Sequence, residues 1–296
     1  MSKGFNLRSF AKINWILKIL GKRDDGFHDL FTAFQMISLY DTIHFEISDE
    51  LLLSCSDVAV PIDDRNLIIK AANALCNLSG QSRGAQIHLE KHIPSPGGLG
   101  GGSSNAAVAL IGLRRLWNMD IPDAELTAIA AELGADVRFF LNGGTAIGTG
   151  RGDVIEPCGD ITCENMLVVT PDVNISTRDV FESLNAPTLT PAEQKRILIV
   201  SRNEADRLDP LTSELKNDLE PGVLAAYPEV RRVKETLLSL GARNAAMSGS
   251  GASVFAVFDN KETRQAAEKA LDHESTWRKF AVSTISRDEY REALGL

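Results

Sequence analysis

Alternating hydrophobic and polar residues near the start of the chain predict a β-strand over residues 10–20. One face of this strand would carry Ile13, Trp15, Leu17 and Ile19, and the other Lys12, Asn14 and Lys18. A polar segment from Gly21 to Gly26 then predicts a turn, and residues 30–46 predict one or two more strands. The chain therefore begins with paired strands.

Helical periodicity follows at residues 66–78, where Leu67, Ala71, Ala74 and Leu75 would face inward, and at residues 126–133, which end at Gly134. Further strands are predicted at 85–90, 166–170, 254–258 and 279–285, further helices at 229–240 and 262–271, and a glycine-rich hairpin at 143–152. Residues 185–210 break this pattern, because they are polar and contain prolines at 187, 191 and 210.

Strands and helices mix without a regular βαβ repeat, which favours the α+β class. A chain of 296 residues suits two domains, at about 150 residues per domain. The change of pattern near residues 155–160 predicts an N-terminal domain over 1–158 and a C-terminal domain over 159–296.

A formal charge of −9 argues against general nucleic-acid binding, which relies on basic surface, but it leaves room for an anionic small molecule. Asn14 and Lys18 interrupt the one apolar segment that resembles a signal peptide, and no stretch approaches the roughly 18 apolar residues of a membrane span. The four cysteines are scattered without a C-x-x-C pair, as expected for free buried thiols in a reducing compartment. We expect a cytoplasmic protein.

The most informative segment is Gly97–Ser104, in which five of the first six residues are glycine. It follows a predicted strand and leads into an apolar helical stretch, so its backbone N–H groups and the helix N-terminus could hold a polyphosphate. The segment fits neither a Walker A loop, which needs a lysine before Ser103, nor a Rossmann fingerprint. A purely structural turn needs only one or two glycines, so nucleotide binding is the better hypothesis.

Several other residues have two readings from the sequence alone. Lys12 could be an ordinary solvated charge, and Asp136, which follows Gly134, could cap the next helix. Phe27, His28 and Phe181 could simply pack in the core.

Three separated motifs occur in the order found in the GHMP kinases. They are Ala11–Asn14, the segment Pro94–Ser104 followed by Asn105-Ala106-Ala107, and Met247–Gly251. The resemblance spans most of the chain. It implies a two-domain GHMP kinase fold, with an N-terminal domain like domain 2 of ribosomal protein S5 and a ferredoxin-like C-terminal domain.

Within this superfamily the chain most resembles the 4-diphosphocytidyl-2-C-methyl-D-erythritol kinase family. The distinguishing segments are Lys12–Asn14, Asp25–Leu30, Asn66–Ile68, Leu133–Val137 with Phe139-Phe140, and Asn217–Glu220. The resemblance implies ATP-dependent phosphorylation of a hydroxyl of that compound, in the non-mevalonate isoprenoid route.

The same resemblance implies roles for individual residues. Asp136 would accept the proton of the attacking hydroxyl, and Lys12 beside it would stabilise the developing charge. The ATP site would comprise Pro94, Ser95, Pro96, Gly97, Gly98, Leu99, Gly100, Gly101, Gly102, Ser103 and Ser104, with Asn66 and Lys91 on the adenine side. The substrate would contact Asn14, Phe27, His28 and Phe181. Phe27 stands where tyrosine is commoner in the family.

Mg²⁺ is the expected cofactor beside ATP, with Ser104 as a candidate ligand. The expected partners are ATP and the cytidine-linked substrate, with no nucleic acid and no membrane, and the protein would be a monomer or a weak homodimer. Two alternatives stay open. One is another GHMP kinase, of the homoserine or phosphomevalonate type, and the other is a non-catalytic protein of this fold that senses a nucleotide or metabolite.

Overall fold

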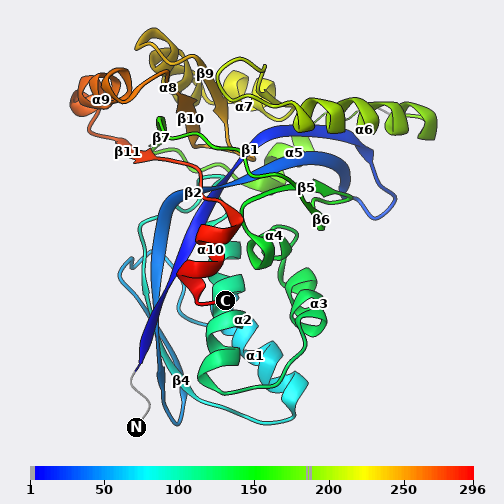
Figure 1. Ribbon diagram of the computed structural model, residues 1–296, viewed down its shortest axis with the longest axis vertical. Coiled ribbons are helices and arrows are strands. Elements are labelled where there is room, and N and C mark those ends of the chain that lie inside the picture. The colour runs from blue at the N-terminus through cyan, green and yellow to red at the C-terminus, as the bar shows by residue number, and fades with distance from the viewer. Residues whose placement is uncertain (1–3, 185, 187–188) are drawn as a thin grey trace.

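A computed structural model describes residues 4–184, 186 and 189–296 and gives an α+β fold (Figure 1). The N-terminal part is built on a seven-stranded sheet with the strand order β3-β4-β2-β1-β8, in which β5 pairs with β2 and β6 with β5. Its strands are β1 (Phe5–Lys22), β2 (His28–Ile47), β3 (Leu51–Cys55), β4 (Ala85–Glu90), β5 (Thr145–Thr149), β6 (Val154–Pro157) and β8 (Lys216–Asn217).

The predicted first strand is present, but its side chains do not divide between two faces as the alternation suggests. The β1–β2 register shifts between Asn14 and Ile16. An extra residue in one strand reverses the faces of all residues beyond it. Ile13 and Trp15 therefore pack in one core cluster, whereas Leu17 and Ile19 pack in another. The prediction of an exposed polar face was also wrong in part, because Lys12 and Asn14 are buried.

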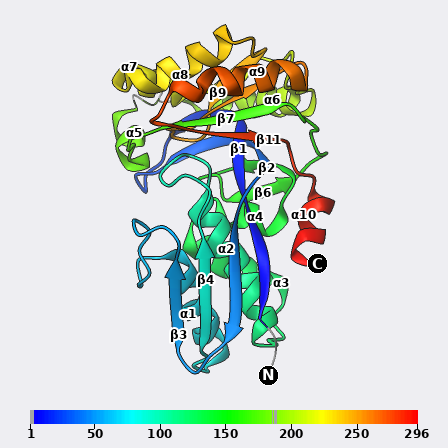
Figure 2. The same ribbon diagram turned by 90° about the vertical axis from the view of Figure 1, so that its left-hand side faces the viewer.

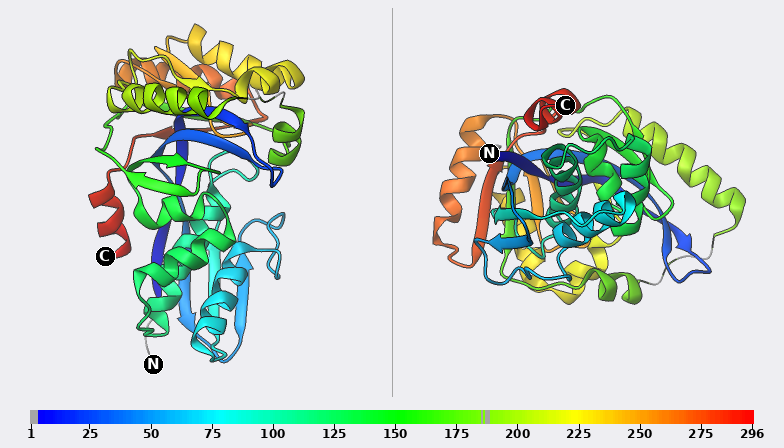
Figure 3. Two further views of the ribbon diagram at one scale, coloured as in Figure 1. Left: turned by 90° about the vertical axis from the view of Figure 1, so that its right-hand side faces the viewer. Right: turned by 90° about the horizontal axis from the view of Figure 1, so that it is seen from below.

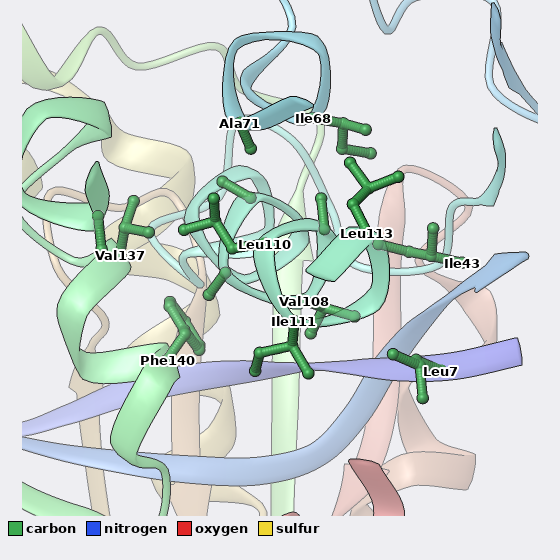
Figure 4. Packing of buried hydrophobic residues seen from close by; sticks show 14 of the residues in the cluster. Leu7, Ile43, Ile68, Ala71, Val108, Leu110, Ile111, Leu113, Val137 and Phe140 are labelled. Carbon is green, nitrogen blue, oxygen red and sulfur yellow. The ribbon is translucent and has the colours of Figure 1, made fainter. Parts of the chain in front are cut away.

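Four helices share the main hydrophobic core with the N-terminal sheet: α1 (Leu67–Ser79), α2 (Gly101–Leu116), α3 (Asp123–Leu133) and α4 (Val137–Asn142). Helix α2 is the central one, with a nearly continuous run of buried residues from Ser104 to Leu113. Figure 4 shows Val108, Leu110, Ile111 and Leu113 of this helix packed among side chains from the sheet and from α1 and α4. The helix that carries the glycine-rich start is therefore anchored in the main core.

The C-terminal part contains the strand–helix order β7 (Met166–Pro171), α8 (Pro228–Ser239), β9 (Asn244–Met247), β10 (Val254–Val257), α9 (Lys261–Ala270) and β11 (Trp277–Val282). Its four strands form a sheet in the order β11-β7-β10-β9, with antiparallel neighbours. This βαββαβ arrangement is ferredoxin-like, as the resemblance implied. Figure 2 shows its helices above the sheet, on the side away from the N-terminal part.

The two parts share a core and exchange segments. Trp15 of β1 meets Phe255 of β10 edge to face, with ring centroids 5.4 Å apart. The short strand β8 pairs in parallel with β1. Helix α10 (Arg287–Leu294), red in Figure 3, lies beside the N-terminal part, where the buried Tyr290 donates a hydrogen bond to the carbonyl oxygen of Phe140. The predicted boundary between residues 158 and 159 falls between β6 and β7.

Most predicted helices and strands are confirmed within a few residues, but the polar segment 185–210 contains a helix that its composition concealed. Helix α6 (Pro191–Asp206) begins with a capping box between Thr190 and Glu193 and has Pro191 in its first turn. Pro187 lies outside the described residues. Two short helices, α5 (Thr177–Ser183) and α7 (Glu220–Ala226), and a 3₁₀ turn at Leu271–His273 complete the described secondary structure.

Two expectations about the whole chain can be compared with the structure. The four cysteines are free, but only Cys163 is buried and the others are half-buried, so the expectation of buried thiols was correct for one of them. Among the helices that the structure describes, none is long and apolar enough to cross a membrane.

Candidate active site

The glycine-rich segment connects β4 to α2, and its backbone conformation depends on glycine at specific positions. Gly98 and Gly100 both have left-handed φ values, of 71° and 70°. A Cβ atom at Gly98 would lie 2.1 Å from the carbonyl oxygen of Ser248, and one at Gly100 would lie 2.8 Å from the ring of Phe140. At these two positions glycine is required by contacts inside the protein.

Gly102 is different, because it is exposed and a Cβ atom there would meet nothing closer than a Leu67 methyl group at 4.0 Å. Helix α2 begins at Gly101, and no side chain of the described residues caps its first turn. The first N–H groups of a helix need partners from outside it. The start of α2 therefore offers unpaired N–H donors and the positive end of a 16-residue helix dipole, which together suit an anion.

A buried carboxylate holds the segment before the glycines. Asp41, at the centre of the sheet, accepts hydrogen bonds from the backbone N–H groups of His92 and Ile93, at 2.7 and 2.8 Å. It also accepts from the Lys91 ammonium and from the Asn105 side-chain amide, each at 2.9 Å. The carboxylate thus fixes the chain both before the loop and in the first turns of α2.

Lys12 and Asp136 meet in front of this loop, although they come from β1 and from the start of α4. Their ammonium and carboxylate are 3.6 Å apart, with the lysine buried and about a third of the aspartate side chain exposed. The backbone N–H of Lys12 donates to the carbonyl oxygen of Leu99 at 2.9 Å, which ties the strand to the glycine segment. Asp136 stands at the N-cap position of α4, but its side chain makes no capping hydrogen bond. Helix capping therefore does not account for this carboxylate.

The surroundings of Lys12 are mixed in polarity. Its ammonium donates to Asn14 Oδ1 at 2.7 Å and lies 5.7 Å from the centre of the Phe34 ring. Burial lowers the pKa of Lys12, and the Asp136 carboxylate acts in the opposite direction. The lysine is thus a desolvated cation held beside one carboxylate.

The third sequence motif closes the site from the C-terminal part. The Ser248 hydroxyl donates to the carbonyl oxygen of Gly98 at 2.9 Å, and the backbone N–H of Ser253 donates to that of Gly97 at 3.2 Å. A Cβ atom on Gly249 would lie 3.2 Å from the Lys12 ammonium. All three motifs found in the sequence therefore converge on one site.

A second group of candidate residues lies at the far end of the β1–β2 pair. His28 and Phe181 have ring centroids 5.5 Å apart and are tilted by 33°. Burial lowers the pKa of His28, with the charge of Lys22 as a smaller cause. Phe27 is separate from this pair, because its ring is 55 % exposed and the Arg151 guanidinium lies 5.0 Å from its centre. The structure therefore brings His28 and Phe181 together but leaves Phe27 apart from them.

Three predicted nucleotide contacts have roles inside the protein. Asn66 caps α1 through its side-chain oxygen, and the Lys91 ammonium is bound to Asp41. Ser104 is fully buried, and its hydroxyl accepts a hydrogen bond from Ser9 at 2.7 Å. This position speaks against Ser104 as a metal ligand, since its hydroxyl faces the core. Among the three predicted ATP-site residues that precede the glycines, Pro94 is buried whereas Ser95 and Pro96 are exposed.

Two cavities, of about 400 and 380 Å³, lie away from these residues. The first lies between α6, β1 and the segment before β8, and the second lies at the ends of α1 and α2. Neither contains Lys12, Asp136 or any residue of the glycine segment, so the convergence of motifs identifies the site better than cavity size does.

Comparison with known proteins decides the family. Models described as the GHMP kinases N terminal domain and the GHMP kinases C terminal match residues 66–144 and 200–275. A 4-diphosphocytidyl-2-C-methyl-D-erythritol kinase of Chlorobium phaeobacteroides is 42 % identical over 267 residues, which cover 90 % of each chain. The chain belongs to the GHMP kinases. A kinase with the same name from Geobacter sp. is 37 % identical over 285 residues, covering 96 % of this chain and all of its own.

Solved structures agree with this assignment. A crystal structure of 4-(cytidine 5'-diphospho)-2C-methyl-D-erythritol kinase superimposes with a TM-score of 0.76 at 30 % identity, covering 95 % of this GHMP kinase and 99 % of the other chain. Homoserine kinase from Cytophaga hutchinsonii gives a TM-score of 0.72 at 20 % identity, which supports the shared fold alone. The family, the fold and the class of enzyme, an ATP-dependent phosphotransferase, are therefore confirmed as the motifs predicted.

Sequence reasoning missed three buried polar residues that support the candidate site, namely Ser9, Thr32 and Asp41, and it assigned no role to Asn105, although that residue lies in one of the motifs. A polar residue inside an otherwise apolar strand or helix was the available signal, since buried polar groups need partners. The partners of these residues lie far away in the sequence, so no local pattern indicated their contacts in the candidate site.

Proposed function

We propose that this GHMP kinase transfers the γ-phosphoryl group of ATP to a hydroxyl of 4-diphosphocytidyl-2-C-methyl-D-erythritol, in the non-mevalonate route to isoprenoid precursors. The Lys12–Asp136 pair, 3.6 Å apart in front of the glycine segment, is the observation that carries this proposal. The names of relatives up to 42 % identical supply the substrate.

ATP would bind with its phosphates at the start of α2. The uncapped first turn supplies N–H donors, and the open space around Gly102 lets an anion approach the backbone closely. Phosphoryl transfer depends mainly on positioning and on electrostatic stabilisation, which rigid backbone donors on an anchored helix provide.

Asp136 would accept the proton of the attacking hydroxyl. Its carboxylate is partly exposed and can reach a substrate, whereas the Lys12 ammonium is buried beside it. Lys12 would stabilise negative charge on the transferred group. A general base of this kind contributes about 10²–10⁴ in rate.

The cytidine end would bind at His28 and Phe181. An aromatic ring stacks a base for about 1–3 kcal/mol, and the polar edge of His28 could hydrogen-bond the cytosine. The exposed Phe27 ring would offer a second apolar surface. Asn14 is buried and its amide is bonded to Lys12 and Thr32, so it would act on the erythritol part through the position of Lys12 rather than by direct contact.

Mg²⁺, when bound, would shield the charge of the phosphates. This ion commonly keeps several waters and binds through phosphate oxygens with few protein ligands. Because the Ser104 hydroxyl faces Ser9, the half-buried Ser103 is the hydroxyl at the helix start that fits such an ion better.

The test is a phosphoryl-transfer assay with ATP and Mg²⁺ against three acceptors: the cytidine-linked methylerythritol, homoserine and phosphomevalonate. ADP release with the first alone supports the proposal. Turnover with one of the others instead assigns a different GHMP kinase. No turnover with any acceptor, while ATP still binds, favours a nucleotide or metabolite sensor.

A matched pair of variants tests the base. Asp136→Asn should lower kcat by about 10²–10⁴ with ATP binding retained. Asp123→Asn makes the same chemical change at an exposed helix start, and it should turn over like the unmodified enzyme. Normal kcat in Asp136→Asn would contradict the assignment.

A further inference from the structure

Three hydrogen bonds form a chain that ends at the Lys12 ammonium. The Thr32 hydroxyl donates to the carbonyl oxygen of Ile16 at 2.8 Å. The Asn14 side-chain NH₂ donates to the Thr32 oxygen at 2.7 Å, and Asn14 Oδ1 accepts from Lys12 Nζ at 2.7 Å. The three residues are at most 4 % exposed, so water does not compete for these bonds.

The available protons fix the direction of this chain. A threonine hydroxyl has one proton, and here it is used on the Ile16 carbonyl, so the Thr32 oxygen can only accept from Asn14. The amide must therefore turn its NH₂ toward Thr32 and its oxygen toward Lys12. The reversed amide would point two N–H donors at an ammonium, which has no lone pair to accept them.

The backbone and packing explain why Thr32 can do this. The register shift between Asn14 and Ile16 places Thr32 opposite Leu17 and lets its hydroxyl reach the Ile16 carbonyl. The methyl group of Thr32 packs on Gly148 of β5, where a Cβ atom would come within 2.9 Å of it. This contact limits rotation of the side chain, so the hydroxyl stays in place.

We infer that Thr32 is a positioning residue for phosphoryl transfer, which acts by fixing the orientation of the Asn14 amide and thereby the position of the Lys12 ammonium. The inference rests on the proposed role of Lys12 in catalysis. Thr32 itself contacts neither Asp136 nor the glycine segment in the described part of the chain.

The groups that face Lys12 determine what the loss of this chain would do. Among the described residues, Asp136 is the charged side chain paired with the Lys12 ammonium. Phe34 and the backbone of Gly249 are neutral neighbours of the same ammonium. Without a fixed acceptor at Asn14, the buried cation loses part of its stabilisation and deprotonates at a lower pH. The alkaline limb of the kcat profile should then move to lower pH.

The test compares Thr32→Val, which removes the hydroxyl at constant shape, with Thr32→Ser, which keeps it. Thr32→Val should lower kcat by about 10- to 100-fold, because small misplacements of catalytic groups cost rates of this order. Its KM for ATP should stay within about twofold of the unmodified value, and its alkaline limb should move to lower pH. Thr32→Ser should restore most of kcat and the original pH profile.

Thr145→Val is the matched control. Thr145 is equally buried in the same sheet, and its hydroxyl also makes one donated bond, to Gln35 at 2.7 Å, and one accepted bond, from the Ile161 N–H at 3.0 Å. It has no bond to Lys12 or Asn14 among those recorded for the described residues. Thr145→Val should lose stability as Thr32→Val does, with kcat and the pH profile unchanged.

Two results would overturn the inference. One is a Thr32→Val enzyme with kcat and alkaline limb like those of the unmodified enzyme, and the other is an equal loss in Thr145→Val. If Thr32→Val does not fold, Thr32→Cys replaces it, since a thiol is of similar size but a weak hydrogen-bonding group.

A second measurement separates this inference from the proposed function. If the unmodified enzyme turns over none of the acceptors, the proposed function fails, but the pKa of Lys12 can still be followed by NMR of ¹³C-labelled lysine, with Lys12→Arg to assign the signal. A lower pKa in Thr32→Val than in the unmodified protein supports the positioning role. An equal pKa overturns it.

Discussion

The Ser248 hydroxyl donates a hydrogen bond of 2.9 Å to the carbonyl oxygen of Gly98, across 150 positions of sequence. This bond joins the ferredoxin-like part of the chain to the glycine segment of the N-terminal part. The Ser248 carbonyl oxygen also occupies the space where a Cβ atom on Gly98 would be. The shape of the glycine segment therefore depends on both parts of the molecule.

Gly98→Ala and Gly102→Ala should have opposite effects on folding. At Gly98 the added methyl group would lie 2.1 Å from a backbone oxygen at a left-handed φ, so Gly98→Ala should destabilise the fold by several kcal/mol. At Gly102 the methyl group meets open space in a helix, so Gly102→Ala should preserve the melting temperature or raise it.

The ATP dependence of Gly102→Ala then tests the phosphate site. Since a methyl group there clashes with nothing in the protein, a rise in KM for ATP of about tenfold or more would report close approach of the phosphates to this backbone. An unchanged KM for ATP would contradict phosphate binding at the start of α2.

Replacing Lys12 by methionine should lower the activity and should also change how the free energy of unfolding depends on pH. Burial holds the folded-state pKa of Lys12 below its ordinary value of 10.5. Between the two pKa values the unfolded chain binds more protons than the folded one, so Lys12 makes stability rise with pH in that window. At neutral pH the ammonium is charged in both states, and its burial cost remains.

The measurement is thermal unfolding of both proteins from pH 7 to pH 10.5. The unmodified protein should gain stability relative to Lys12→Met as pH rises toward 10.5, while kcat of the variant falls by about 10²–10³. A stability difference that is flat with pH would mean that Lys12 does not titrate below its ordinary range.

Phe181→Ala should weaken binding of the cytidine-linked substrate and leave ATP binding unchanged. Loss of a stacking ring costs about 1–3 kcal/mol, which corresponds to roughly a 5- to 150-fold rise in KM. Phe181→Tyr keeps the ring and is the control. An equal rise in KM for ATP would show that the ring supports the whole fold rather than the cytidine end.

His28 adds a pH dependence to the same site. Because burial lowers its pKa below the ordinary value of 6.5, the ring is neutral at pH 7 and above, and KM for the substrate should be flat there. As pH falls through the folded-state pKa the ring becomes charged, and KM should change only then. The pH profile of His28→Asn, which cannot titrate, should lack this change.

Features that depend on neighbouring residues could be predicted well from the sequence alone. Alternation predicted β1 and β4, short apolar runs predicted β7 and β10, and the 3.6-residue period predicted α1 and α8, because these patterns depend on which sides of an element are buried. The order of the three motifs predicted the family, and five glycines before an apolar helix predicted a loop whose backbone can approach an anion.

Features that depend on distant residues were accessible only in part. The resemblance supplied Lys12 and Asp136, but no local pattern indicated that the lysine would be buried, since one side of its strand looked polar. Helix α6 was missed because its exposed surface masks the period, although the Thr190–Glu193 capping box was readable. Ser104 was misplaced, because its position in the motif does not say which way its hydroxyl turns.

Short stretches of sequence were enough to predict most of the helices and strands and the family, since each depends on residues that are close together in the chain. Contacts between distant residues, by contrast, set the reversal of faces at the β1 bulge, the anchoring of the glycine segment by Asp41, and the hydrogen bonds that join Thr32 and Asn14 to Lys12. The physical reason is that a buried polar group is satisfied by whatever partner the closed sheet brings to it. That partner is fixed by register and packing, which no local pattern encodes.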